Sequence, residues 1–237
     1  DNKIFLINQD NRLLSFSTND GSAIWNIRSI PSFIKSQSFL SSALSKQGYL
    51  IAVNSSGDLL KINSADGNIL WSLNTLGSML THATDFFKSS DIVITDENII
   101  FSTQSSMFSY NLSTGYTNWQ SDVSSIAAPI VDGKNIFFVT VNGYFVIMDI
   151  DTGKVISSTN ILKILKKRKQ LTEITGFIMG SGKIYSVTLN GYLIVSSASS
   201  GKVESFKKIG HPVTSAPIIS DGKLFIYTES SRILGFN

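Results

Sequence analysis

A short turn motif recurs along the 237-residue chain and restricts the possible folds more than any other feature of the sequence. In each complete copy, a glycine precedes a tryptophan by four residues. The three complete pairs are Gly21 with Trp25, Gly67 with Trp71, and Gly115 with Trp119. Two further copies, at Gly153 and Gly201, have serine at the tryptophan position, Ser157 and Ser205. Successive glycines lie 46, 48, 38 and 48 residues apart, a period that indicates repeated supersecondary units.

Each repeat contains short apolar runs that predict strands. The runs are too short for helices and are rich in Ile, Val, Phe and Tyr. The repeat that begins at Ser125 is the clearest, with runs at 125–131, 135–140, 144–149 and 154–159. One turn between them is Asn-Gly at 142–143, the strongest short signal for a β-hairpin. Since four antiparallel strands form one blade of a β-propeller, we expect each repeat to be a blade.

We therefore predict an all-β protein, a β-propeller of four-stranded antiparallel blades in a single domain over residues 1–237. The expected blades are a partial blade at 1–28, full blades at about 38–74, 81–121, 125–160 and 172–208, and a partial blade at 212–237. This assignment gives about 22 strands, whereas a closed ring of four-stranded blades needs a multiple of four. We expect an incomplete ring.

The composition predicts a folded core and excludes several classes of function. Hydrophobic residues make up 42% of the chain and charged residues 16%, which is too apolar for a disordered chain. The sequence contains no cysteine, so disulfides, thiolate metal sites and cysteine nucleophiles are excluded. The two histidines, His82 and His211, lack partners at metal-ligand spacing. We predict no metal and no other cofactor.

Sequence motifs of catalysis are also missing. The chain has no Gly-x-Ser-x-Gly element and no Walker-type phosphate loop. Asp149, Asp151 and Gly153 resemble the start of a calcium loop, but their spacing is too short and favours a hairpin turn. We predict that the protein is not an enzyme. The three tryptophans are expected to pack between neighbouring blades, because the outermost strand carries each of them.

One segment carries a large share of the basic charge. Five of the 20 basic residues are Lys163, Lys166, Lys167, Arg168 and Lys169, and without them the net charge of +3 becomes −2. Nucleic acid is therefore a poor candidate for a partner. The pattern at 161–165 predicts a short helix with Ile161, Leu162, Ile164 and Leu165 on one face. Its basic residues form either a solvated connection or a patch that attracts anionic lipid or an acidic partner.

The repeats resemble a known family. The Asp/Thr-Gly-x-x-x-Trp turn and the Ala-Pro openings at 128–129 and 216–217 are similar to the PQQ-like repeat of quinoprotein propellers. The chain resembles most closely the BamB family of outer-membrane protein assembly factors, and the similarity is strongest over 216–236. The resemblance implies an eight-bladed propeller whose amino-terminal blades are missing here. It also implies a lipoprotein scaffold at the periplasmic face of the bacterial outer membrane.

The resemblance further implies a partner, the POTRA region of BamA within the β-barrel assembly (BAM) complex. The family's contact loop starts with Pro-Ser, which matches Pro31 and Ser32, and continues here with Phe33, Ile34 and Lys35. Lys35 replaces an arginine of the family pattern and cannot form its bidentate contacts. A second family contact uses two aspartates, for which this chain offers Asp85 or Asp91. The family's anchoring cysteine is absent.

Two other functions share the same repeat. A PQQ-dependent dehydrogenase, or a fragment of one, would hold a quinone and Ca²⁺ among clustered Glu, Asn and Asp. This sequence has no obvious acidic cluster. A propeller that binds a sugar or peptide without a role in assembly is the third alternative.

Overall fold

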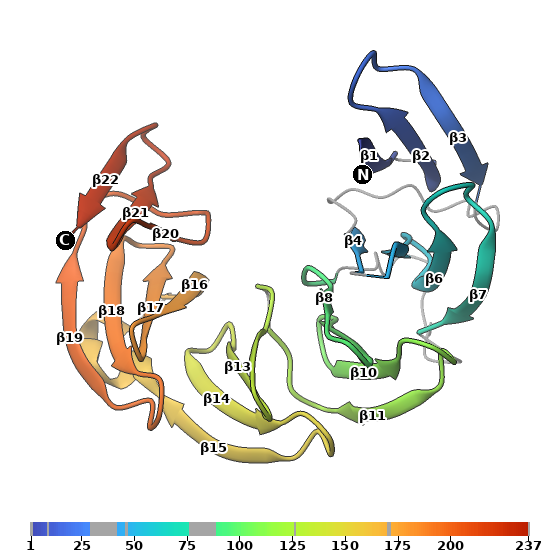
Figure 1. Cartoon of the computed structure of the whole chain (residues 1–237). Helices are drawn as coiled ribbons and strands as arrows, with labels where there is room; N and C mark the ends of the chain where they lie inside the picture. The colour runs from blue at the N-terminus through green and yellow to red at the C-terminus, as the bar shows by residue number, and fades with distance from the viewer. Residues whose placement is uncertain are drawn as a thin grey trace. The chain divides into compact units, whose positions relative to one another are not determined.

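The computed structural model describes residues 2–8, 10–28, 42–45, 47–75, 89–125, 127–169 and 172–236. These residues form 22 strands in six antiparallel sheets (Figure 1). In every sheet each strand pairs with the next one along the chain, as in the blades of a propeller. The predicted all-β class and the expected number of strands are confirmed.

Two compact units divide the chain: Asp1–Gln104 with Phe108–Trp119, and Ser105–Met107 with Gln120–Asn237. The first unit holds sheets 1 and 2 and most of sheet 3. Sheet 1 is β1 (Lys3–Ile7), β2 (Arg12–Ser17) and β3 (Ala23–Arg28); sheet 2 is β4 (Ser42–Leu44), β5 (Tyr49–Val53), β6 (Asp58–Asn63) and β7 (Ile69–Asn74). Sheet 3 is β8 (Val93–Ile94), β9 (Asn98–Ser102), β10 (Met107–Asn111) and β11 (Thr117–Ser121).

The second unit holds sheets 4, 5 and 6. Sheet 4 is β12 (Ile130–Asp132), β13 (Asn135–Val139), β14 (Tyr144–Asp149) and β15 (Val155–Asn160); sheet 5 is β16 (Ile174–Gly180), β17 (Lys183–Thr188), β18 (Tyr192–Ser197) and β19 (Val203–Lys208). Sheet 6 is β20 (Ile218–Ser220), β21 (Lys223–Tyr227) and β22 (Ile233–Phe236). Sheets 1 and 6 have three strands each.

Two predicted strands are shorter than the sequence indicated. The apolar run at 125–131 predicts a strand over its whole length, and the similar Ala-Pro segment near 213–219 predicts another, but β12 begins at Ile130 and β20 at Ile218. In both cases the strand starts directly after a proline, Pro129 or Pro217. Proline has no N–H to donate to a ladder, so it stands at the edge of regular pairing.

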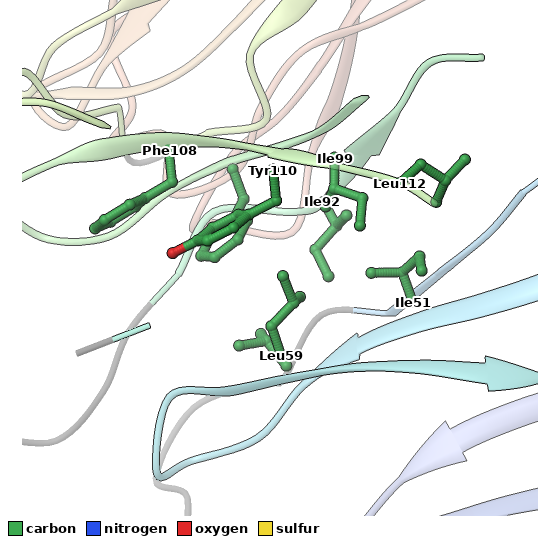
Figure 2. Close-up of a cluster of buried hydrophobic side chains, with 9 residues drawn as sticks. Ile51, Leu59, Ile92, Ile99, Phe108, Tyr110 and Leu112 are labelled. Carbon is green, nitrogen blue, oxygen red and sulfur yellow. The ribbon is translucent and has the colours of Figure 1, made fainter. Parts of the chain in front are cut away.

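The first unit has one buried cluster between sheets 1 and 2 and another between sheets 2 and 3. Ile51 and Leu59 of sheet 2 face Ile99, Phe108 and Tyr110 of sheet 3 (Figure 2). The rings of Phe108 and Tyr110 stack with centroids 5.9 Å apart. β5 and β9 are buried on both faces after their first residue, whereas the outermost strand β7 has mostly exposed or half-buried residues. Sheets packed face to face bury their middle strands in this way and leave the outer strand partly solvated.

A 3₁₀ helix, η2 (Ile161–Lys169), follows sheet 4. The predicted apolar face needs a correction: Ile161, Leu162 and Leu165 are buried, but Ile164 is 37% exposed. A 3₁₀ helix turns by three residues, so Leu162 and Leu165 lie on the same side and Ile164 on another.

Candidate binding surfaces and inter-sheet contacts

The first tryptophan of the repeat packs against the glycine turn of the following sheet. Trp25 of β3 is 9% exposed, and its Nε1–H donates to the carbonyl oxygen of Ser64 at 3.1 Å. Gly67, three residues further on, has a φ of +79°. A Cβ built on Gly67 would lie 2.9 Å from Cδ2 of Trp25. The turn therefore requires glycine for its backbone conformation and also for the space that the indole occupies.

The second tryptophan, Trp71, also packs on the glycine turn of the following sheet, but a lysine and not the indole donates the hydrogen bond to that turn. A Cβ on Gly115 would lie 3.1 Å from Cδ2 of Trp71, but the buried Nε1 of Trp71 has no hydrogen-bond partner among the described residues. The carbonyl oxygen of Leu112, equivalent to that of Ser64, accepts from Nζ of Lys61 at 3.0 Å instead. Lys61 is 7% exposed, and its ammonium group lies 4.0 Å from the ring centroid of Tyr49. Desolvation lowers the pKa of Lys61.

Other side chains make the corresponding contact where serine replaces tryptophan at Ser157. A Cβ on Gly201 would lie 2.7 Å from Cβ of Thr159 and 2.8 Å from Cδ1 of Phe145. The hydroxyl of Thr159 donates to the carbonyl oxygen of Ser200 at 3.0 Å. The glycine turn of sheet 5 is thus covered by a phenyl ring and a threonine instead of one indole.

Most of the predicted partner-binding residues lie outside the described residues. This applies to Phe33, Ile34 and Lys35 in segment 29–41, and to Asp85 in segment 76–88. Asp91 is described: it is exposed, it precedes the buried Ile92, and its carbonyl oxygen accepts from the hydroxyl of Ser90 at 3.0 Å. The role of these residues in binding stays a prediction.

The basic segment begins on a well-anchored turn. Leu162 packs on the hairpin turn of sheet 4, where a Cβ on Gly143 would overlap Cγ of Leu162. Oδ1 of Asn160 accepts from the backbone N–H of Lys163 at 3.1 Å, in the manner of a helix cap. The side chain of Lys163 is exposed, and Lys166, Lys167, Arg168 and Lys169 complete the same helix, η2. Attraction of this segment to anionic lipid or to an acidic partner stays a prediction.

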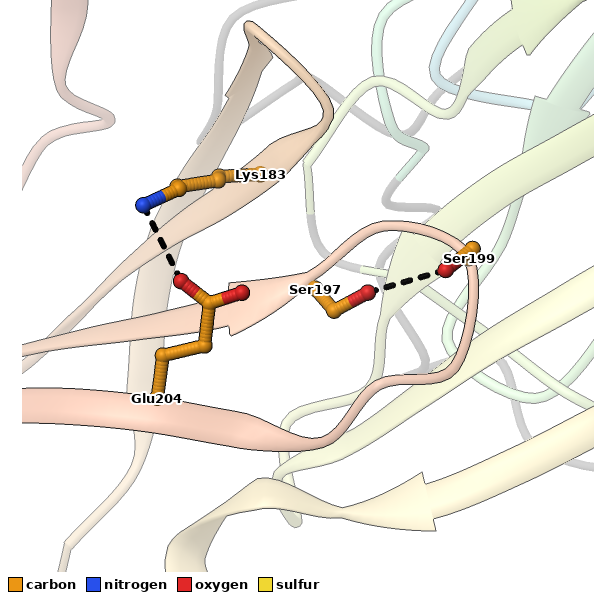
Figure 3. A network of polar contacts seen from close by, with 4 residues as sticks. All are labelled: Lys183, Ser197, Ser199 and Glu204. Carbon is orange, nitrogen blue, oxygen red and sulfur yellow. Dashed lines mark hydrogen bonds and ion pairs between the residues drawn. The ribbon is translucent and has the colours of Figure 1, made fainter.

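Charged groups elsewhere in the second unit pair locally. Nζ of Lys183 on β17 lies 3.0 Å from Oε2 of Glu204 on β19, and the hydroxyls of Ser197 and Ser199 are 3.0 Å apart in the neighbouring turn (Figure 3). The hydrogen bond with Glu204, and then its charge, raise the pKa of Lys183. Both side chains are more than 40% exposed, so solvent screens the pair.

Nothing in the described part of the chain forms a metal centre. No group of three or more His, Asp or Glu side chains is close enough there to hold an ion. Nε2 of His211 lies 3.3 Å from Nη1 of Arg232. Among the same residues, no helix is long and apolar enough to cross a membrane.

Consecutive antiparallel sheets of up to four strands, with Trp25 and Trp71 packed on the glycine turn of the following sheet, define the chain as a protein of the β-propeller class. The family model described as outer membrane protein assembly factor BamB matches residues 1–159. The chain belongs to this family. No match was found among curated protein sequences.

Solved structures show the same fold at low sequence identity. BamB from Moraxella catarrhalis superposes with a TM-score of 0.79 at 12% identity, over 99% of this chain and 69% of that one. Quinohemoprotein alcohol dehydrogenase from Comamonas testosteroni gives 0.68 at 15% identity, over 100% of this chain and 44% of that one. The WD40 domain of Sif2 gives 0.72 at 12% identity, over 100% and 64% of the two chains. Because the fold occurs in both an enzyme and a BamB protein, it does not by itself decide between catalysis and scaffolding.

Proposed function

We propose that this chain is a non-enzymatic scaffold in the assembly of outer-membrane proteins. The match of residues 1–159 to the BamB family is the observation that carries the proposal. The packing of the tryptophans is in keeping with a scaffold, because Trp25 and Trp71 cover the glycine turns of neighbouring sheets.

The proposed partner is the POTRA region of BamA within the β-barrel assembly complex, at the periplasmic face of the outer membrane. Phe33 and Ile34 would bury against this partner, and Lys35 would orient it through a carboxylate. Asp85 or Asp91 would supply a second contact. The exposed position of Asp91 is compatible with this role.

Titration of the purified POTRA region against the Phe33→Asp variant tests the proposal. An apolar anchor replaced by a charge is expected to weaken binding by about tenfold or more. Ile156→Asp is a matched control, because Ile156 is 59% exposed on β15 and lies outside the predicted loops. Unchanged affinity in both Phe33→Asp and Asp91→Lys, with both variants folded, would remove these residues from the interface.

A quinoprotein function fits the described residues poorly. Calcium in proteins takes six or more oxygen ligands, largely from carboxylates and carbonyls. The described residues hold no cluster of three acidic side chains that could contribute such ligands. A quinone absorbance shift on addition of PQQ and Ca²⁺ would reverse this assignment.

A further inference from the structure

The helix η2 and the end of β19 lie at the same end of sheets 4 and 5. The backbone N–H of Ile161, the first residue of η2, donates to the carbonyl oxygen of Gly143 in the hairpin turn of sheet 4 at 2.9 Å. The N–H of Ile209, directly after β19, donates in the same way to Gly191 in the equivalent turn of sheet 5 at 2.8 Å. η2 contacts β19 as well as β14. We call this end, where the chain passes from sheet 4 to sheet 5, the connection end.

Basic residues are concentrated at the connection end. It has seven basic and two acidic residues: Lys163, Lys166, Lys167, Arg168, Lys169, Lys207 and Lys208, against Asp122 and Glu173. The opposite end of the same two sheets has four residues of each sign: Lys134, Lys154, Lys183 and Lys202, against Asp132, Asp149, Asp151 and Glu204. The positive charge of these sheets is therefore gathered at one end, where it attracts anions.

The 3₁₀ geometry of η2 places lysines at equivalent positions of the helix. Residues three apart lie above one another in a 3₁₀ helix, and positions 163, 166 and 169 are all lysine. Leu165 is buried, whereas Lys163 and Ile164 are exposed. A row of three cations thus starts at an exposed residue of an anchored helix.

The composition of η2 favours a membrane surface over a folded acidic partner. No acidic residue lies between Asp151 and Glu173, so this stretch carries no negative charge to balance its own cations. Four of the five cations of η2 are lysines, which lack the planar fork by which arginine recognises single carboxylates. Ile164 adds an apolar side chain that is 37% exposed. Lysines beside exposed apolar residues are typical of segments that lie on anionic lipid.

We propose that the connection end binds the surface of an anionic phospholipid membrane. The lysines of η2 and Lys208 of β19 lie near the headgroups, and Ile164 enters the boundary between headgroups and acyl chains. Each basic residue near such a surface strengthens binding by about fivefold, so the row of three lysines contributes about 100-fold. Lipid binding at this end is independent of the scaffold function proposed above.

Co-sedimentation with lipid vesicles tests the proposal. At low salt, the unmodified protein is expected to bind vesicles that contain phosphatidylglycerol and not vesicles of pure phosphatidylcholine, and to lose this binding at high salt. The triple variant Lys163→Gln, Lys166→Gln and Lys169→Gln is expected to bind about 100-fold more weakly. Circular dichroism checks that it is folded, and the dependence on salt and lipid of the unmodified protein keeps the test decisive where it is not.

A second triple variant removes the same charge from the opposite end of the same sheets. It combines Lys134→Gln, Lys154→Gln and Lys202→Gln, all at exposed turn residues, and is expected to lower the affinity by less than about fivefold. Absence of binding to phosphatidylglycerol vesicles, equal binding to phosphatidylcholine, or equal weakening by the two triple variants would overturn the proposal. Binding of soluble poly-glutamate without binding of vesicles would overturn it as well, and would assign the connection end to an acidic partner.

Discussion

Substitution of alanine for Gly67 should destabilise the first unit more than the same substitution at Gly21. Both glycines are in the turn that precedes a tryptophan, and both have positive φ, +79° and +72°. An L-residue in this conformation costs about 1–2 kcal/mol. Gly67 also carries a steric requirement, because its Cβ would lie 2.9 Å from Cδ2 of Trp25, whereas a Cβ on Gly21 meets nothing within 4 Å.

The difference in the free energy of unfolding between Gly67→Ala and Gly21→Ala measures the steric contact of position 67 with Trp25. Overpacking of a buried site typically costs about 1–3 kcal/mol. We therefore expect a loss of about 1 kcal/mol for Gly21→Ala and about 2–4 kcal/mol for Gly67→Ala in the free energy of unfolding. Urea denaturation followed by tryptophan fluorescence gives both values, and Gly67→Ala should also shift the native emission to the red as Trp25 loses its cover.

A double-mutant cycle provides the decisive control. In a Trp25→Leu background the indole is gone, so the excess cost of Gly67→Ala over Gly21→Ala should largely disappear. Equal losses for Gly21→Ala and Gly67→Ala in the otherwise unmodified protein would refute the inter-sheet contact as the reason for this glycine.

Two further predictions concern the buried ionisable groups Lys61 and Tyr110. The lowered pKa of Lys61 means that the folded state gives up its proton before the unfolded state does, so stability should rise as pH increases from the folded pKa toward 10.5. Lys61→Met should lack this rise, and equal slopes of urea stability against pH in the two proteins would contradict the assignment. Burial raises the pKa of Tyr110 to about 12, so its unfolded form ionises first and stability should fall between pH 10 and 12. The stability of Tyr110→Phe should fall less steeply over that range, and an equal fall in both proteins would contradict the raised pKa of Tyr110.

The sequence predicted the elements of the fold better than their contacts. Strands and turns follow from local patterns, so the repeat around Gly143 could be assigned closely. The contact of Trp25 with Gly67 involves residues 42 positions apart, and the sequence indicated only that an indole would pack on a neighbouring blade. Lys61 was missed altogether, because a lysine in a strand is ordinarily expected to face solvent. Its position opposite Trp71 becomes meaningful only when the register is known.

For the candidate sites too, the sequence indicated single residues but not the contacts that these residues make. Serine at position 205 was visible as a departure from the repeat, but its pairing with Val195, directly before a shift of register, is known only from the structure. Residues Phe33 to Lys35 were singled out through family resemblance, which reports what relatives use. Their local sequence is too short to define a binding surface by itself.

The two tryptophan-to-glycine contacts of the first unit join one repeat to the next instead of closing within one repeat. Trp25 belongs to sheet 1 but rests on the turn of sheet 2, and Trp71 of sheet 2 rests on the turn of sheet 3. Damage at one turn should therefore loosen the sheet that comes before it in the chain, and amide hydrogen exchange would report this one sheet away from the mutation. Deletion or duplication of one of these repeats would therefore also disturb its neighbour, because the indole and the glycine turn of each contact belong to different repeats.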